Sequence, residues 1–302
     1  MKNYDRNTHE IVLVNANSGT RATRRRVDAL FRRVCESGLV IYTRSSQETE
    51  KVAARASGDG ISRLVVVGGD GTLHHAVNGL LSVPDTRTKL AILPRGTAND
   101  YVATLRQVTG AIQSRSTTVD VGLIESGTFQ RYFLNVAGLG LTAHTAQAAK
   151  PAPWLPARVR YTVGLMRTLV YGWKHFQAML QLDMEPVSTK NILTLSIAIG
   201  QREGSYTLAP TARIDDGRFN VLLATDLRRR DVLRYLPGLM VDKLPQDDRR
   251  VEYLAASRVT LTPQTPVHLH LDGEVYGNGL LEGGEKITVR HAARLEVELI
   301  ER

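Results

Sequence analysis

Two glycines, a carboxylate, a third glycine and a hydroxyl follow a run of three valines, in the stretch Gly68-Gly69-Asp70-Gly71-Thr72. Apolar residues recur at helical spacing directly after it, which predicts a buried strand, a tight loop and a helix N-terminus. Glycines let backbone N–H groups approach a ligand closely, and a helix N-terminus favours an anion such as phosphate. The stretch lacks a Walker lysine and GxGxxG spacing, so a structural turn stays open as the alternative.

A second polar cluster follows the next predicted strand, residues 90–93. It reads Pro94-Arg95-Gly96-Thr97-Ala98-Asn99-Asp100. A third carboxylate, Asp120, lies in the apolar stretch 119–124. Two clusters of this composition, about thirty residues apart and each at the end of a strand, favour a ligand site over two unrelated turns.

The elements that position these clusters alternate between strand and helix. Strands are predicted at 11–14 and 39–43, and helices are predicted after each of them, the first from Val27, Leu30, Phe31 and Val34 and the second at 47–56. This order predicts a parallel sheet covered by helices on both faces. Ligands of such sheets bind beyond the carboxyl ends of the strands, where we expect the Asn17 loop, Thr43 and the loop 68–72.

The second half of the sequence is rich in strands and turns. Strands are predicted at 193–199, 218–224, 258–262, 267–271 and 286–290. The pattern predicts a β-sandwich-like second domain, and we place an N-terminal α/β domain at 1–124, with 291–302 returning to it, and a β-rich domain at 125–290.

Composition limits the class of protein and its partners. The 302 residues contain 42% hydrophobic residues, one cysteine and a net charge of +9, which fits a globular protein of a reducing cytoplasm with an anionic partner. The polar start predicts no signal peptide, and no apolar run reaches membrane-spanning length. Without a zinc-finger or RNP motif, the arginine clusters do not predict nucleic-acid binding; solvated helix faces are their alternative explanation.

The segment 151–176 holds both tryptophans of the chain, with basic residues between the aromatic ones. Such a segment can lie in a membrane interface. A helix packed on the second domain is the commoner explanation of such a pattern, and the two explanations are compatible.

These motifs together resemble the bacterial diacylglycerol-kinase-like lipid kinases, a group that includes sphingosine and ceramide kinases. The resemblance continues through Phe133–Gly140, Ala209-Pro210 with Asp216-Gly217, and Asp272-Gly273-Glu274. It implies ATP bound between a Rossmann-like nucleotide domain and a β-sandwich-like domain, with the active site in the cleft. A lipid hydroxyl would attack the γ-phosphate with Mg²⁺ present.

The resemblance also assigns roles to residues. Nucleotide contacts are expected from Asn17, Thr43, Gly68, Gly69, Asp70, Gly71, Thr72, His74, Gly96, Thr97 and Asn99. Asp70, Asp100 and Asp120 would join a water–magnesium network, with a turn cap as the alternative for Asp120. A structural metal would take the Asp216 side chain and the carbonyls of Arg213 and Arg218, with a hairpin turn as the alternative. Asp272 would accept the hydroxyl proton, and Glu274 would orient it.

Two stretches depart from the family pattern. His74-His75 stands where the family has Asn-Glu. If His74 contacts phosphate, nucleotide affinity should fall as the pH rises past about 6.5; a neutral pair on a helix surface is the alternative. The loop 200–206 carries more charge than the family's glycine-rich loop, which leaves the substrate open.

The sequence therefore predicts a cytoplasmic, peripherally membrane-associated, ATP- and Mg²⁺-dependent lipid kinase, with diacylglycerol as acceptor and phosphatidic acid as product. Alternatives are another acceptor (a sphingoid base, phosphatidylglycerol or a polyprenol), an NAD kinase, and a non-catalytic protein that binds nucleotide or lipid. A homodimer is left open as a further partner.

Overall fold

A computed structural model describes residues 9–16, 38–112, 116–152, 154–245, 247–276 and 281–300. Two compact units divide the chain, and each is considered by itself. Unit 1 comprises Met1–Val119 with Leu295–Arg302, and unit 2 comprises Asp120–Arg294. The predicted helix through Val27 and Val34, the arginines between 21 and 33, and Asn17 lie outside the described residues.

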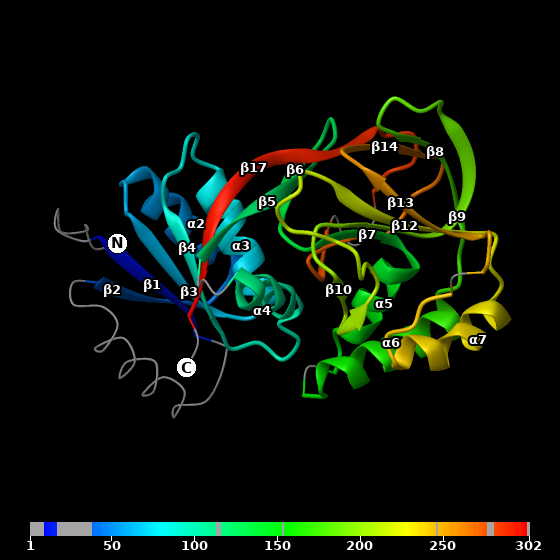
Figure 1. Cartoon of the computed structure of the whole chain (residues 1–302), viewed down its shortest axis with the longest axis horizontal. Helices are drawn as coiled ribbons and strands as arrows, with labels where there is room; N and C mark the ends of the chain where they lie inside the picture. Colours follow the sequence, from blue (N-terminus) through cyan, green and yellow to red (C-terminus); the bar gives the residue numbers. More distant parts are fainter. Residues whose placement is uncertain are drawn as a thin grey trace. The chain divides into compact units, whose positions relative to one another are not determined.

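A parallel sheet forms the centre of unit 1 (Figure 1). Its strands are β1 (Glu10–Asn15), β2 (Gly38–Thr43), β3 (Arg63–Gly68) and β4 (Lys89–Pro94), in the order β4-β3-β1-β2. Their near-continuous apolar runs are typical of parallel strands that are covered on both faces. One core cluster contains alternate residues of three strands: Val12 and Val14 of β1, Val65 and Val67 of β3, and Ala91 and Leu93 of β4.

Three described helices accompany this sheet: α2 (Ser46–Gly58), α3 (Asp70–Leu81) and α4 (Asp100–Ile112). Ser45 caps α2 by accepting the Glu48 N–H. Helices α2 and α3 pack closely at Gly79, where an added Cβ would lie 2.3 Å from the carbonyl oxygen of Glu50. The strand–helix order predicted for the N-terminal half is confirmed over the described residues.

Unit 2 is built mainly from antiparallel strands, with a path β16-β15-β7-β9-β8-β14 and with β12 pairing β9 and β13. The strands and their bounds are β5 (Ser116–Glu125), β6 (Gln130–Phe133), β7 (Val136–Gly140), β8 (Phe176–Leu182), β9 (Ser188–Ala198), β10 (Arg202–Glu203), β11 (Tyr206–Thr207), β12 (Phe219–Thr225), β13 (Val251–Ala256), β14 (Arg258–Pro263), β15 (Leu269–Leu271) and β16 (Glu274–Val275). The strand-rich character predicted for this half is confirmed.

One long strand, β17 (Ile287–Leu299), replaces the two segments expected near the C-terminus. Its first residues pair antiparallel with β14, and its last residues pair parallel with β4. The predicted strand at 286–290 and the returning tail are therefore one continuous element.

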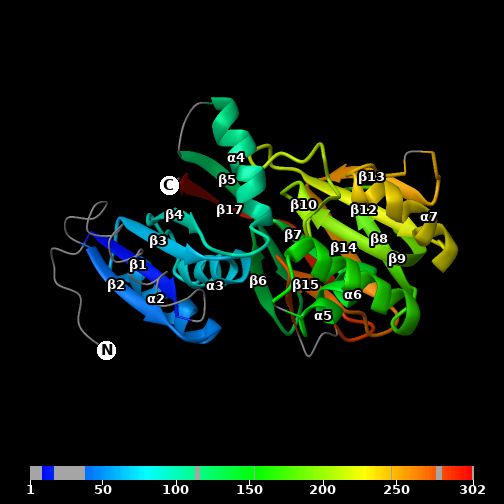
Figure 2. The same cartoon turned by 90° about the horizontal axis from the view of Figure 1, so that it is seen from below.

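Among the described residues of unit 2 there are three helices: α5 (Leu141–Ala149), α6 (Ala157–Tyr171) and α7 (Arg229–Met240). Leu165 and Leu169 bury one side of α6 in a core cluster, which confirms a helix packed on the second domain. The sequence analysis did not predict α7, although Val232, Tyr235, Leu236 and Leu239 recur at helical spacing and pack against the same cluster. Figure 2 shows α6 and α7 with the strands of unit 2.

Candidate active site

Most of the glycine stretch 68–72 in unit 1 belongs to a strand or a helix, and the loop itself is short. Strand β3 ends at Gly68 and α3 begins at Asp70, so only Gly69 lies between them. An added Cβ at Gly69 would lie 2.8 Å from the Cα of Gly96, and one at Gly68 would lie 2.6 Å from the Thr72 side chain. The backbone therefore packs at a distance that only glycine permits, at the N-terminus of a helix where anions bind well.

The two polar clusters of unit 1 contact each other through Asp70. Its carboxylate accepts the N–H groups of Asp100, at 3.2 Å, and Tyr101, at 3.3 Å, at the start of α4. Asn99, with φ of 51°, closes the second loop by accepting the Gly96 N–H and donating to the Gly96 carbonyl. The structure thus brings both clusters to the carboxyl ends of β3 and β4.

Three hydroxyl-bearing residues of the predicted nucleotide site differ in their surroundings. Thr72 is buried and accepts a 3.0 Å hydrogen bond from Asn15 at the end of β1. Thr43 is buried, and its hydroxyl lies 2.9 Å from that of Thr49. Thr97 is exposed. Sequence reasoning chose Asn17 and missed Asn15, although its position at the end of a strand was a usable signal.

His74 is not on a helix surface, as one interpretation of the sequence had it. It is 1% exposed, and its ring lies next to the Asn78 side chain. His75 faces α2 and lies 2.8 Å from the Glu50 carboxylate. Burial in the second turn of α3 gives no support to a phosphate contact by the His74 ring, because a phosphate contact requires an accessible nitrogen.

A cavity of about 530 Å³ adjoins the second polar loop of unit 1. Gly96, Asn99 and two arginines, Arg95 and Arg106, contribute to its wall. Guanidinium groups beside a glycine loop suit an anionic ligand such as a nucleotide phosphate. Sequence reasoning noted Arg95 only as part of a motif and missed Arg106, which lies in the second turn of α4.

The predicted metal ligands fall into two groups. Asp70 and Asp100 adjoin each other in unit 1; one or two carboxylates with substrate phosphates are what Mg²⁺ uses in many kinase sites, so these residues fit that ion. Among the described residues, no group of three or more acidic, histidine or cysteine side chains is arranged for a metal.

Asp120 belongs to unit 2 and contacts the loop 213–218. Its buried carboxylate accepts the Gly217 N–H at 2.7 Å and a hydrogen bond from Arg294 at 2.9 Å. Arg294 also donates to the carbonyl of Asp215, at 2.6 Å. Asp216 accepts the Arg218 N–H, and the side chains of Arg213 and Arg218 are exposed. A guanidinium thus links this loop to Asp120, and the structural metal expected there stays a prediction.

Asp272, the predicted proton acceptor, lies on a turn between β15 and β16 in unit 2. One carboxylate oxygen accepts the Asn135 and Val136 N–H groups, at 2.8 and 3.1 Å, and the other accepts the Leu134 N–H at 3.1 Å. Three backbone donors hold the side chain in one orientation. Glu274, half-buried, begins β16 two residues later.

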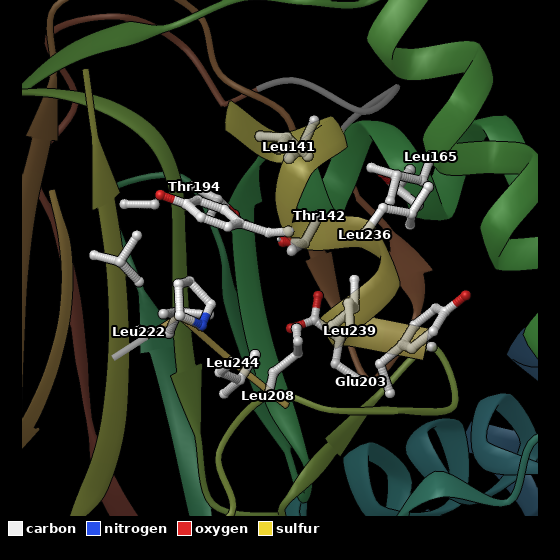
Figure 3. Close-up of a pocket in the computed structure, with 18 of the residues that line it drawn as sticks. Leu141, Thr142, Leu165, Thr194, Glu203, Leu208, Leu222, Leu236, Leu239 and Leu244 are labelled. Carbon is white, nitrogen blue, oxygen red and sulfur yellow. Dashed lines mark hydrogen bonds between the residues drawn. The ribbon is translucent and has the colours of Figure 1, made fainter. Parts of the chain in front are cut away.

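An apolar cavity of about 150 Å³ lies in the same unit, and Figure 3 shows its leucine-rich wall. Leu141, Leu165 and Leu222 line it from α5, α6 and β12, and Leu236 and Leu239 line it from α7. Glu203 is the only acidic residue among the described ones that line it. An alkyl chain fits such a wall, because burying apolar surface is favourable.

The sequence comparisons identify both halves of the chain. Residues 9–124 match the diacylglycerol kinase catalytic domain, and residues 135–282 match the YegS C-terminal NAD kinase beta sandwich-like domain. The chain is 32% identical over 238 residues to a protein of Chromohalobacter salexigens named "Probable lipid kinase YegS-like", covering 74% of this chain and 73% of that protein. It is 27% identical over 288 residues to a diacylglycerol kinase of Staphylococcus aureus (strain bovine RF122 / ET3-1), covering 89% and 86%.

Solved structures confirm the fold. A diacylglycerol kinase from Bacillus anthracis str. Sterne superimposes with a TM-score of 0.64 at 18% identity, covering 95% of both chains. Yeast NADH kinase, complexed with NADH, superimposes with a TM-score of 0.52 at 12% identity, covering 97% of this chain and 84% of that one. The two domain matches and the relative at 32% identity confirm the resemblance seen in the sequence: the chain belongs to the diacylglycerol-kinase-like family of lipid kinases that includes the YegS-like proteins.

Proposed function

We propose that the protein transfers the γ-phosphate of ATP to the hydroxyl of a lipid, with diacylglycerol as the acceptor and phosphatidic acid as the product. The hydroxyl oxygen forms a bond to the γ-phosphorus, the bond from that phosphorus to the β–γ bridging oxygen breaks, and ADP leaves. The observation that best supports a lipid acceptor is the leucine-lined cavity in the unit that also holds Asp272.

Unit 1 supplies the nucleotide side of the proposal. The N–H groups around Gly69 and Gly71 bind phosphate at the start of α3, and Arg95 and Arg106 offset its negative charge. Asp70 and Asp100 would hold Mg²⁺, which neutralises charge on the phosphates when bound.

Unit 2 supplies the acceptor side. The cavity takes the lipid chains, and Asp272 accepts the proton of the hydroxyl as the new bond forms. Its three backbone donors fix the carboxylate before the lipid arrives, so orientation costs little at the moment of reaction.

The outer sides of α6 and α7 support peripheral binding to an anionic membrane. No acidic residue occurs between Glu125 and Asp183. Apolar side chains exposed on α6 are Val159, Met166, Val170 and Tyr171. On α7, Leu233 is 46% exposed among the exposed Arg229, Arg230 and Arg234. Exposed apolar residues among cations are typical of helices that lie in a membrane interface. No described helix has the length and apolar character needed to span a bilayer.

The two helices meet at one end, since Arg158 of α6 donates to the carbonyl of Met240 at 2.9 Å. Both also line the apolar cavity with their inner sides. A membrane bound to their outer sides would hold its lipids close to the cavity. We propose the cytoplasmic membrane surface, where ATP is available, as the place of action.

The direct test measures transfer of labelled γ-phosphate from ATP to diacylglycerol and other hydroxyl lipids in mixed micelles, with NAD in a parallel reaction. We expect labelled phosphatidic acid, and loss of label in Asp272→Asn with ATP binding retained. Labelled NAD and unlabelled lipid would contradict the proposal.

Membrane binding is tested by sedimentation with vesicles of anionic or neutral phospholipid. Binding to anionic vesicles should exceed binding to neutral ones and fall with salt. Arg234→Ser should weaken it about fivefold, at about 1 kcal/mol per basic residue near the surface. The control Lys286→Ser removes one exposed charge elsewhere in unit 2 and should have little effect. An equal loss of vesicle binding in both variants would contradict the proposal that the outer sides of α6 and α7 bind the membrane.

A further inference from the structure

Two buried titratable side chains of unit 2, Glu203 and His270, are not used in the steps above. An oxygen of the Glu203 carboxylate lies 2.7 Å from Nε2 of His270, and the other lies 2.6 Å from the Ser196 hydroxyl. The side chains of His270 and Glu203 are 1% and 10% exposed. Burial alone would raise the pKa of the Glu203 carboxyl, but His270 and the hydroxyls of Ser196 and Thr142 hold it below its usual value.

A glycine makes room for this pair in the sheet. Ser196 on β9, Gly138 on β7 and His270 on β15 are in register on neighbouring strands. An added Cβ at Gly138 would lie only 2.2 Å from Nε2 of His270. The missing side chain therefore lets the ring lie over β7, within reach of Glu203.

The hydrogen bonds fix which ring nitrogen of His270 carries the proton. The Gly273 N–H points to Nδ1 at 3.2 Å, so Nδ1 is the acceptor of this bond. A ring that accepts at Nδ1 carries its N–H on Nε2, which donates to Glu203. The pair forms a directed chain from the cavity wall to the backbone of Gly273.

That backbone belongs to the turn that carries Asp272. Asp272 and Gly273 have φ of 52° and 87°, the left-handed region that glycine adopts freely and that aspartate tolerates better than most residues. The N–H of Asp272 donates to the Val136 carbonyl, and the N–H of Gly273 donates to His270. His270 is thus one of the groups that hold this turn.

We propose that Glu203 and His270 are positioning residues that align the Asp272–Gly273 turn, with Glu203 in the wall of the apolar cavity. Glu203 fixes the ring through Nε2, and the ring fixes the turn through Nδ1. Because Glu203 is also part of the cavity wall, a lipid in the cavity lies against the carboxylate that sets the turn. The catalytic role of the aligned turn rests on the proposed function. The hydrogen-bond chain itself does not depend on that function.

Substitution of His270 by an amide residue tests its two hydrogen bonds, to Glu203 and from Gly273, one at a time. In His270→Asn the carbonyl oxygen can take the place of Nδ1 and accept the Gly273 N–H. In His270→Gln the amide reaches the place of Nε2 and retains only the contact with Glu203. We expect His270→Gln to lower kcat about tenfold or more with the KM for lipid within twofold, because a small misplacement of a catalytic group is costly. His270→Asn should retain several times more of kcat.

Glu203→Gln and Glu203→Ala form the second matched pair. The glutamine oxygen can still accept from Nε2, so Glu203→Gln should stay within about threefold of the wild type, whereas Glu203→Ala should resemble His270→Gln. ATP binding and thermal unfolding serve as folding controls, and either pair suffices if one variant fails to fold. Equal kcat within both pairs, or a change in KM alone, would overturn the proposal.

Amide hydrogen exchange of the peptide 269–276 gives a readout that does not depend on activity. Exchange should be faster in His270→Gln than in His270→Asn, and equal exchange would overturn the proposal. If the wild type labels no lipid, the proposed function fails, and the exchange comparison alone still decides whether the pair holds the turn.

Discussion

Most polar residues of the candidate site in unit 1 come from two short segments, 68–72 and 94–100, at the ends of neighbouring parallel strands. Three others, Asn15, Thr43 and Arg106, come from β1, β2 and α4. The polar residues of unit 2 come from β9, β10 and β15 and from the chain before β7, so Glu203 and His270 are 67 residues apart in sequence. Unit 1 uses local strand–loop–helix geometry that one motif can specify. Unit 2 depends on antiparallel pairing, which no short motif encodes.

The difference predicts that damage to one unit leaves the ligand of the other bound. Asp272→Asn should lower lipid phosphorylation about a hundredfold or more, because the amide cannot accept the proton. ATP binding, measured by titration calorimetry, should stay within about twofold. Near-normal phosphorylation by this variant would remove Asp272 from the chemistry and leave it as a turn residue.

The reverse change is Gly96→Ala in unit 1. Its Cβ would lie 2.5 Å from the Cα of Gly69 and 2.7 Å from the Asn99 side chain, so the two loops must separate. At about 1–3 kcal/mol for overpacking, ATP affinity should fall about tenfold or more. The matched control is Gly110→Ala on α4, where an added Cβ meets nothing within 4 Å. Similar ATP affinity in both variants would show that the loop contact is not needed.

A smaller effect is expected on the stability of unit 2 at acid pH, where one buried histidine titrates. Burial, with smaller contributions from His268 and Lys174, lowers the pKa of His144 in unit 2 from 6.5 to about 4. The unfolded chain therefore binds a proton that the folded one does not between these values, so stability should fall as the pH drops from 6.5 to 4. The melting temperature should therefore drop between pH 6.5 and pH 4, and in His144→Gln the total drop should be smaller by a few degrees. Identical declines in the two proteins would place the titrating group elsewhere.

Much of the site in unit 1 could be predicted because the relevant contacts are short-range. The Gly-Gly-Asp-Gly-Thr stretch fixes a strand end and a helix start, and the paired clusters indicated one sheet edge. Asn15 and Arg106 were missed because each contributes to the site only through the direction of its side chain. Asn15 reaches Thr72 from the end of β1, and Arg106 reaches the cavity beside Gly96 from α4. The burial of His74 was also not readable from its neighbours.

The sequence by itself determined the family, the α/β and β-rich halves and the motif carrying Asp272, because these depend on residue type and local spacing. Tertiary structure alone decided that Glu203 faces a cavity, that His270 bonds Gly273, and that Arg294 joins Asp120 to the loop 213–218. The contacts of Glu203 and His270 follow from strand register and from the room that Gly138 leaves. Register is a property of paired strands, and a single stretch of sequence does not contain it.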